Sequence, residues 1–542
     1  MTTLSFEAAG AALTAVEEHV PALVRDDVAA RLLAQDPTLW GPDAEAEASI
    51  RLGWLNPTEA SRPLVGQIRA LREELAAEGV TRVVLAGMGG SSLAPEVITR
   101  TAGVDLTVLD STDPDSVRHA LAEGLDRTVI VVSSKSGSTV ETDSQRRTFE
   151  QAFTDAGIDA KSRIVVVTDP GSPLDAASRE AGYRAVFNAD PNVGGRYSAL
   201  TAFGLVPSGL AGADIEGLLN EAEDALEILS DNAAENIGLQ LGAALGGTSP
   251  LRNKIVIVDE GSGLAGFPDW AEQLIAESTG KLGTGLLPVV AEPGSPETVS
   301  GASDVLVVRL AAVDSETAPE GNQVVVAGTL GGQMMLWEFA TAVAGRILGI
   351  NPFDQPDVEA AKKAARGLLD ARPGPTEPSF VDGSVEVRAD SSLLKGAHTL
   401  PGALTALFSA LGEHGYLSVQ AYLDRGAQST LADVRPGLAA ITGRPVTFGW
   451  GPRFLHSTGQ FHKGGPAEGA YLQITGAPAE DLPIPGRPFS FAELINAQAD
   501  GDAQVLADQG RPVLRLNLLN REAGVAQLET AIRTLAVEGG AN

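Results

Sequence analysis

Short runs of β-branched and apolar residues alternate with helix-like stretches along much of this chain. One series of such runs is VVLAG (83–87), LTVLD (106–110), VIVVSS (129–134), RIVVVTD (163–169) and AVFNAD (185–190). A second series is KIVIVDEG (254–261), LLPVVAE (286–292), DVLVVRL (304–310) and QVVVAG (323–328). Strands separated by helices form βαβ units with parallel sheets, and ligands bind beyond the carboxyl ends of such strands. The pattern therefore predicts an α/β protein with a duplicated architecture.

The 542 residues are too many for one ordinary core, so two or more domains are expected. We expect a helical N-terminal segment over residues 1–60 and α/β domains over 61–213 and 214–370. The proline-rich ARPGPTEPS (371–379) is interpreted as a linker to a C-terminal block, 371–542. That block contains further strand-like runs at 416–424, 445–451, 470–476 and 512–518. It is expected to complete the second domain and the active site.

The composition excludes several classes of protein. The net charge of −31 argues against nucleic acid or an anionic membrane surface as a partner. The absence of cysteine excludes disulfides, a thiol nucleophile and a cysteine metal site. The start, MTTLSFEAAG, does not resemble a signal peptide, and no stretch of ~20 apolar residues could span a membrane. We therefore expect a cytoplasmic protein.

A hydroxyl-rich loop follows the run that begins at Val129. The segment reads VIVVSSKSGSTVET, so an apolar strand ends in Ser134, Lys135, Ser136 and Thr139 before a potential helix. Backbone N–H groups, hydroxyls and the positive end of a helix dipole attract anions. With one lysine and no bulky side chain, the loop suits a phosphate monoester, although such a loop can also be a simple helix cap.

Two glycine-rich motifs flank this loop in the sequence. GMGGSSLAP (87–95) directly follows a strand, and its glycines permit close backbone approach beside Ser91 and Ser92. It lacks the GxGxxG pattern, so a dinucleotide site is only weakly supported. VGGRYSALTAFGL (193–205) places a fixed cation, Arg196, beside two glycines. The first motif alone is also compatible with a strand-to-helix turn capped by serine, and the second with a surface or structural arginine.

Charged residues lie on the apolar faces of two predicted helices. In DWAEQLIAESTGK (269–281), Glu277 shares a helical face with Trp270 and Leu274. In NPFDQPDVEAAKKAARGLL (351–369), Lys362 lies on the apolar stripe. A carboxylate on an apolar face is costly unless it is paired or used, which favours Glu277 as a base. A charged last turn and a snorkelling lysine are the alternatives.

GPRFLHSTGQFHKGGP (451–466) contains His456 and His462, two of only six histidines. No third ligand with suitable spacing lies nearby, so a metal site is not expected. Histidines in such a loop can act as acid–base groups, or they can be hydrogen-bonded structural residues.

The chain resembles the glucose-6-phosphate isomerase family, because it carries five of that family's motifs in order: GMGGSSLAP, SSKSGSTVET, GGRYSALTAFGL, EQLIAESTGK and NPFDQPDVEAAK. FLHSTGQFHKGGP is similar to the branch whose isomerase half is also found fused to transaldolase. The resemblance implies two sugar-isomerase (SIS-type) αβα sandwich domains with mainly parallel sheets and the active site between them. It also implies the metal-free interconversion of glucose 6-phosphate and fructose 6-phosphate through an enediolate, with no cofactor.

The resemblance also implies a role for each matched residue. Gly90 and Ser91 would line the sugar site, Ser134, Lys135, Ser136 and Thr139 would hold the phosphate, and Gln355 would contact it. Arg196 would stabilise the enediolate, Glu277 would move the proton between C2 and C1, and Lys362 would assist ring opening.

The chain departs from the family at the ring-opening histidine. Most members carry it shortly after a Gly-Glu-Pro-Gly segment, but the sequence after AEPG (291–294) has no histidine there. We therefore predict that the C-terminal block supplies it, with His462 favoured over His456. In the family this group comes from a neighbouring subunit, which implies a homodimer. A dual phosphoglucose/phosphomannose isomerase and a non-catalytic sugar-phosphate-binding module remain alternatives.

Overall fold

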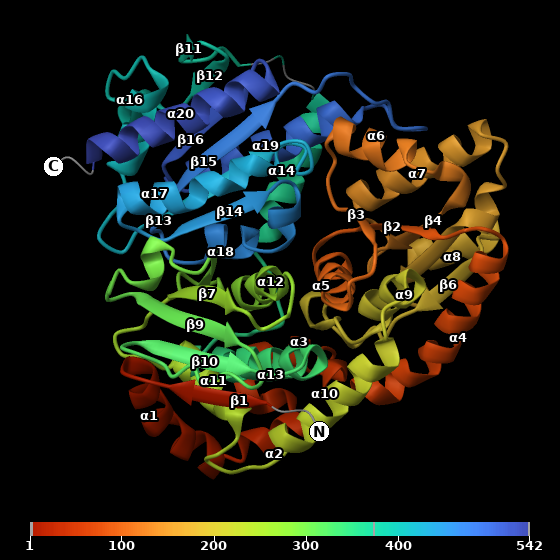
Figure 1. Ribbon diagram of the computed structural model, residues 1–542, viewed down its shortest axis with the longest axis vertical. Helices are drawn as coiled ribbons and strands as arrows, with labels where there is room; N and C mark the ends of the chain where they lie inside the picture. The colour runs from red at the N-terminus through yellow and green to blue at the C-terminus, as the bar shows by residue number, and fades with distance from the viewer. Residues whose placement is uncertain (1–3, 372–373, 375, 540–542) are drawn as a thin grey trace.

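The computed structural model of the protein describes residues 4–371, 374 and 376–539. It contains three sheets, each with helices packed against it (Figure 1). The predicted linker at 371–379 falls partly on Arg372, Pro373 and Pro375, which lie outside the described residues. No helix in these described ranges is both long and apolar enough to cross a membrane.

The first sheet is entirely parallel, with the order β3-β2-β4-β5-β6. Its strands are β2 (Arg82–Gly87), β3 (Thr107–Leu109), β4 (Thr128–Ser133), β5 (Ile164–Thr168) and β6 (Ala185–Asn188). The helices of this block are α4 (Pro57–Ala77), α5 (Leu93–Ala102), α6 (Pro114–Ala122), α7 (Val140–Asp155), α8 (Pro173–Ala181) and α9 (Ala202–Ala211). All five strands occur where the apolar runs predicted them.

Both faces of the first sheet are buried, as expected for a parallel sheet. Leu85 and Val131 pack in one apolar cluster with Phe203 of α9. Their neighbours Val84 and Ile130, which point to the opposite face, pack in another cluster with residues of α7. This two-sided burial explains why the strands are continuous apolar runs rather than alternating ones.

The second sheet has the order β1-β10-β9-β7-β8 and is parallel except for β1. Its strands are β1 (Ser5–Ala8), β7 (Lys254–Glu260), β8 (Leu287–Ala291), β9 (Val305–Ala311) and β10 (Gln323–Ala327). Its helices are α1 (Ala11–Arg25), α2 (Val28–Leu33), α3 (Pro42–Ala48), α10 (Ile215–Leu229), α11 (Ile237–Gly246), α12 (Phe267–Thr279) and α13 (Leu330–Leu348). The N-terminal segment is thus mainly helical but also adds an edge strand, which was not predicted.

The C-terminal block forms a third sheet of its own. The order is β11-β12-β16-β15-β13-β14, with β13 to β16 parallel to one another. The strands are β11 (Phe380–Asp382), β12 (Val385–Arg388), β13 (Tyr416–Tyr422), β14 (Val446–Trp450), β15 (Gly469–Gly476) and β16 (Val513–Leu518). The helices are α15 (Ser391–Leu394), α16 (Leu400–Phe408), α17 (Arg435–Thr442), α18 (Gly459–Gly464), α19 (Phe491–Asp508) and α20 (Arg521–Gly539), with α14 (Val358–Ala371) leading into the block.

One continuous apolar core joins the first two blocks, and the third sheet has another. A further cluster packs Tyr416 and Tyr471 of the third sheet against Val256 and Val289 of the second. In Figure 1 the third block lies beside both of the others, with α14 and α19 on the side that faces the first block. The α18 helix contacts α12 of the second block. The block is therefore placed to contribute residues to a site between the first two sheets.

Candidate functional site

A cleft of about 340 Å³ lies where the three blocks meet. It is lined by every predicted site residue except His462: Gly90, Ser91, Ser134, Lys135, Ser136, Thr139, Arg196, Glu277, Gln355, Lys362 and His456. The lining comes from the carboxyl ends of β2 and β4, from α12 and α14, and from the turn that precedes α18. The topology thus gathers residues that are far apart in the sequence.

The hydroxyl-rich loop connects β4 to the N-terminus of α7. Ser134 Oγ lies 3.0 Å from Thr139 Oγ1, and Gly137 N–H donates to Ser134 Oγ over 3.2 Å. Gly137 has a φ of +69°, which lets the loop turn back on itself beside the helix. Thr139 is the N-cap residue of α7, and its side chain makes no capping hydrogen bond to the helix. The helix N-terminus at this loop is of the kind that attracts an anion.

Lys135 is held at the edge of this loop by Asp169. Its Nζ lies 2.6 Å from Asp169 Oδ2 and donates to the Pro191 carbonyl over 3.3 Å. Burial raises the pKa of Asp169, although the Lys135 charge opposes that shift. The ammonium group therefore sits at the cleft with an acidic partner of its own.

Gly90 allows two turns to approach closely. A Cβ on Gly90 would lie 1.9 Å from the Gly195 carbonyl oxygen, so only glycine fits here. Gly195 begins the 3₁₀ turn Gly195–Tyr197, and this turn carries Arg196. Gly90 of the first glycine-rich motif thus lets the turn that carries Arg196 pack close to the loop after β2.

Arg196 and Glu277 form the charged centre of the cleft. Arg196 Nη1 lies 3.3 Å from Glu277 Oε1, while Gln273 Nε2 donates to Glu277 Oε2 over 3.1 Å. The guanidinium is 2% exposed and donates to Ser278 Oγ at 2.8 Å and to the Pro352 carbonyl at 2.7 Å. These bonds leave the arginine little freedom, so its charge is fixed beside the carboxylate.

The segment that begins at Asn351 adds two more predicted residues. Gln355 Oε1 accepts a hydrogen bond from Arg196 Nη1 over 2.9 Å. Lys362, on α14, is 40% exposed and its Nζ lies 2.9 Å from Glu359 Oε1. The segment is joined to α12 by Lys281, whose Nζ lies 2.6 Å from Asp354 Oδ1, and burial lowers the pKa of Lys281 to about 8.

His456 lies in hydrogen-bond contact with a buried carboxylate beside the cleft. Its Nε2 lies 3.2 Å from Glu141 Oε1 on α7, and Gln498 Nε2 of α19 donates to the same oxygen over 2.7 Å. Burial raises the pKa of Glu141, but its hydrogen bond to His456 and the charges of His456 and Lys362 bring that pKa below the ordinary value. The Glu141 carboxylate therefore orients the imidazole.

His462 lies outside the cleft, contrary to the preference for it in the sequence analysis. It is 1% exposed on α18, packs parallel to the Tyr416 ring at 6.0 Å, and lies 3.4 Å from both Ser418 Oγ and Gln420 Nε2. Burial lowers its pKa well below the ordinary value of a histidine. The short segment between the two histidines carries the chain from the cleft into the interior of the third block.

Several residues in the cleft or directly behind it were not predicted. Gln273 lies one helical turn before Glu277, so the helical periodicity could have indicated it. Glu141 belongs to the hydroxyl-rich motif itself, but nothing in the sequence shows that it meets His456. Asp169 follows a predicted strand, while Gln498 lies in a helix with no distinguishing local pattern.

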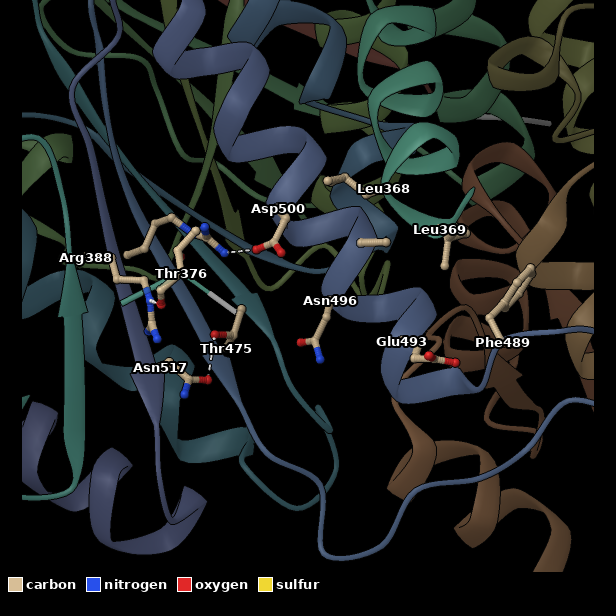
Figure 2. Close-up of a pocket in the computed structure, with 12 residues that line it drawn as sticks. Leu368, Leu369, Thr376, Arg388, Thr475, Phe489, Glu493, Asn496, Asp500 and Asn517 are labelled. Atoms are coloured by element: carbon tan, nitrogen blue, oxygen red, sulfur yellow. Dashed lines mark hydrogen bonds and ion pairs between the residues drawn. The ribbon is translucent and has the colours of Figure 1, made fainter. Parts of the chain in front are cut away.

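A second cavity, of about 370 Å³, lies beside the third sheet and contains none of the predicted residues (Figure 2). Arg388 and Arg515, opposite each other on β12 and β16, are among its lining residues. Each guanidinium has a carboxylate partner, Glu386 for Arg388 and Asp500 for Arg515. Among the described residues, no group of three or more His, Cys, Asp or Glu could hold a metal ion.

Comparison with known proteins identifies relatives of the chain. The family model for phosphoglucose isomerase matches residues 62–281. A glucose-6-phosphate isomerase from Rubrobacter xylanophilus is 31% identical over 377 residues, covering 56% of this chain and 85% of the relative. A probable glucose-6-phosphate isomerase from Natronomonas pharaonis is 30% identical over 337 residues, covering 53% of this chain and 78% of the relative.

Solved structures share the fold. A hypothetical protein from Thermus thermophilus has a TM-score of 0.57 and 25% identity, covering 68% of this chain and 99% of that one. A glucose-6-phosphate isomerase from Chlamydia trachomatis has a TM-score of 0.50 and 21% identity, covering 57% of this chain and 74% of that one.

The fold, the cleft and these relatives define an isomerase of the α/β class. Within that class, the chain belongs to the glucose-6-phosphate isomerase family. The third sheet, which spans residues 380–518, lies outside the matched family model. The family model therefore says nothing about this sheet, and its contribution to the site is inferred from the contacts described above.

Proposed function

We propose that the protein interconverts glucose 6-phosphate and fructose 6-phosphate by acid–base catalysis through an enediolate. The observation that carries this proposal is the 3.3 Å contact between Arg196 and Glu277 in a cleft that also contains the hydroxyl-rich loop. A base, a fixed cation and an anion cradle are the three elements that this reaction requires.

In the proposed reaction the loop holds the phosphate and thereby positions the sugar carbons. Ser134, Ser136, Thr139 and the Lys135 charge bind the phosphate, with Gln355 at its edge. Gly90 and Ser91 lie against the sugar. Binding energy from this non-reacting group is then available to orient C1 and C2 at the base.

Glu277 is the proposed base for the isomerisation step. Its carboxylate takes the proton from C2 of the open-chain aldose, and the C1 carbonyl oxygen becomes the enediolate oxygen. Arg196 stabilises that negative charge. Return of the proton to C1, with transfer of a proton from the C2 hydroxyl to the oxygen on C1, gives the ketose.

Ring opening needs a second acid–base group, and we assign it to His456 instead of His462. His456 lines the same cleft as Glu277, and its imidazole is oriented by Glu141. It would donate its proton to the ring oxygen while the proton of the C1 hydroxyl passes to a water molecule, so that the C1–O5 bond breaks and the C1 carbonyl forms. Lys362, whose positive charge lowers the pKa of Glu141, would assist this step.

The homodimer implied by the resemblance remains a prediction, as does the cytoplasmic location. Here His456 comes from the same chain as Glu277, so the proposed chemistry does not itself require a second copy. Size-exclusion chromatography with light scattering would give the oligomeric state, and fractionation of cells would give the location.

A coupled assay tests the proposal. Wild-type protein and Glu277→Gln are supplied with glucose 6-phosphate or mannose 6-phosphate. Turnover of glucose 6-phosphate by the wild type and its loss in the variant are expected. Turnover of both sugars would instead indicate a dual phosphoglucose/phosphomannose isomerase, and binding without turnover would indicate a non-catalytic module.

A further inference from the structure

The turn that carries His456 belongs to the third block and contacts both of the other blocks. This 3₁₀ turn, η9, spans Arg453–His456. Its last carbonyl, that of His456, accepts a hydrogen bond from Gln273 Nε2 of α12 over 2.8 Å. A Cβ on Gly89 would lie 3.0 Å from the same carbonyl oxygen, so the turn packs closely against the loop after β2.

The first residue of the turn is anchored by its side chain. Arg453 is 13% exposed; its Nη2 is ion-paired with Glu96 on α5, and its Nε lies 3.3 Å from Asp110 Oδ2 after β3. Burial opposes the charge of Arg453, but Asp110, Glu96 and Asp269 outweigh it and raise the pKa of the guanidinium. The charged form of Glu96 is likewise favoured: burial opposes its charge, yet Arg453 and Arg425 lower its pKa to about 2.

Both anchors belong to the block that carries Glu141. Glu96 and Asp110 hold the start of η9 on the first block, and Glu141 meets the imidazole at the end of the same turn. Arg453 is not among the residues that line the cleft. Any influence of its ion pairs on the reaction is therefore indirect, and the position of His456 at the end of the same turn is the most direct route for it.

We propose that Arg453 is a positioning residue, which fixes His456 against Glu141 by anchoring η9 on Glu96 and Asp110. This inference rests on the proposed function, because it assigns ring opening to His456. A displacement of about 1 Å at a reacting group can cost ~100-fold in rate, so the anchor has a measurable effect if it sets this geometry.

A merely structural role makes a different prediction. If Arg453 only stabilised the contact between the blocks, its loss would reduce activity whether or not His456 were present. If it acts through His456, its loss should have little further effect once the imidazole has been removed. A double-mutant cycle separates these two cases.

The experiment compares Arg453→Gln, His456→Ala and the double variant. The rate of exchange between the α and β anomers of glucose 6-phosphate, measured by NMR, reports ring opening without proton transfer at C2. Arg453→Gln should slow this exchange by about 10- to 100-fold. In the His456→Ala background the same change should have less than a ~2-fold effect.

Arg425→Gln is the matched control. Arg425 Nη2 also pairs with Glu96, at 3.1 Å, but it follows β13 and does not belong to η9. This variant should retain anomer exchange within about 2-fold of the wild type. Glu96→Gln, which keeps Arg453 but removes a partner, should slow the exchange in the same direction and provides the test if Arg453→Gln does not fold by circular dichroism.

Each outcome is decisive. Unchanged anomer exchange in folded Arg453→Gln, or an equal loss with and without His456, would overturn the positioning role while leaving the proposed function intact. Absence of both anomer exchange and isomerisation in the wild type would reject the proposed function and, with it, this inference.

Discussion

Arg196 Nη1 lies 3.3 Å from Glu277 Oε1, and Gln273 holds the other oxygen of the same carboxylate at 3.1 Å. The cation and the carboxylate thus share one place in the cleft. In the proposed reaction, the charge that leaves Glu277 as it accepts a proton reappears on the enediolate, where Arg196 can still reach it.

Glu277→Gln should therefore lower kcat by about 100- to 10,000-fold, the usual contribution of a general base. KM for glucose 6-phosphate should change little, because the anion cradle is untouched. Steady-state kinetics measure both constants. Anomer exchange should persist in this variant, and its loss together with isomerisation would show that Glu277 also acts in ring opening.

Lys135→Ala should mainly weaken binding. The lysine provides a charged hydrogen bond worth roughly 1.5–3 kcal/mol, so KM should rise by about 10- to 100-fold with a smaller effect on kcat. Lys161→Ala, in an exposed turn, is the control of equal charge change. An unchanged KM in Lys135→Ala would remove this residue from the phosphate site.

Gly90→Ala should damage the site through the backbone. The new Cβ would meet the Gly195 carbonyl oxygen at 1.9 Å, so the Arg196 turn must move. We expect a loss of about 1–3 kcal/mol in unfolding free energy and a fall in kcat/KM. Gly66→Ala is the matched control: this exposed position in α4 has nothing within 4 Å of a Cβ, so helix propensity predicts stabilisation.

The sequence predicts the first two sheets well because their strands are buried on both faces. Each of β2 to β10 coincides with an apolar run, and parallel order follows from the intervening helices. The strands that were missed, β1, β11 and β12, are short and lie at or near sheet edges. Their pairing depends on distant partners, such as Ser5 with Ala327, which no local pattern reveals.

Part of the cleft lining could be predicted from the same strand pattern. Loops that follow parallel strands meet at one sheet edge, so Gly90, Ser134 and Lys135 could be grouped from the sequence. The sequence favours His462 over His456 and does not reveal that His462 is buried, because α18 is too short for periodicity to define its buried face. The ion pair between Arg453 and Glu96 joins residues 357 positions apart and has no sequence signature.

The two histidines should behave oppositely on substitution. His456→Ala should slow anomer exchange and turnover of the cyclic sugar by about 100-fold or more, because ring opening loses its acid. His462→Ala should instead lower the unfolding free energy, since it leaves a cavity between Tyr416 and Tyr471. A folded His462→Ala protein without anomer exchange would reverse this assignment.

His462 should also make the protein sensitive to acid. Burial, with smaller effects of Lys463 and Arg511, lowers its pKa well below 6.5 in the folded state. The unfolded chain therefore binds more protons than the folded one as the pH falls below about 6.5, and stability declines there by up to ~1.4 kcal/mol per pH unit. Urea unfolding of the wild type and His462→Gln, compared between about pH 7.5 and 5.5, isolates this contribution because other titrating groups are common to both. The wild type should lose more stability than the variant; equal losses would show that His462 is protonated in the folded protein as readily as in the unfolded chain.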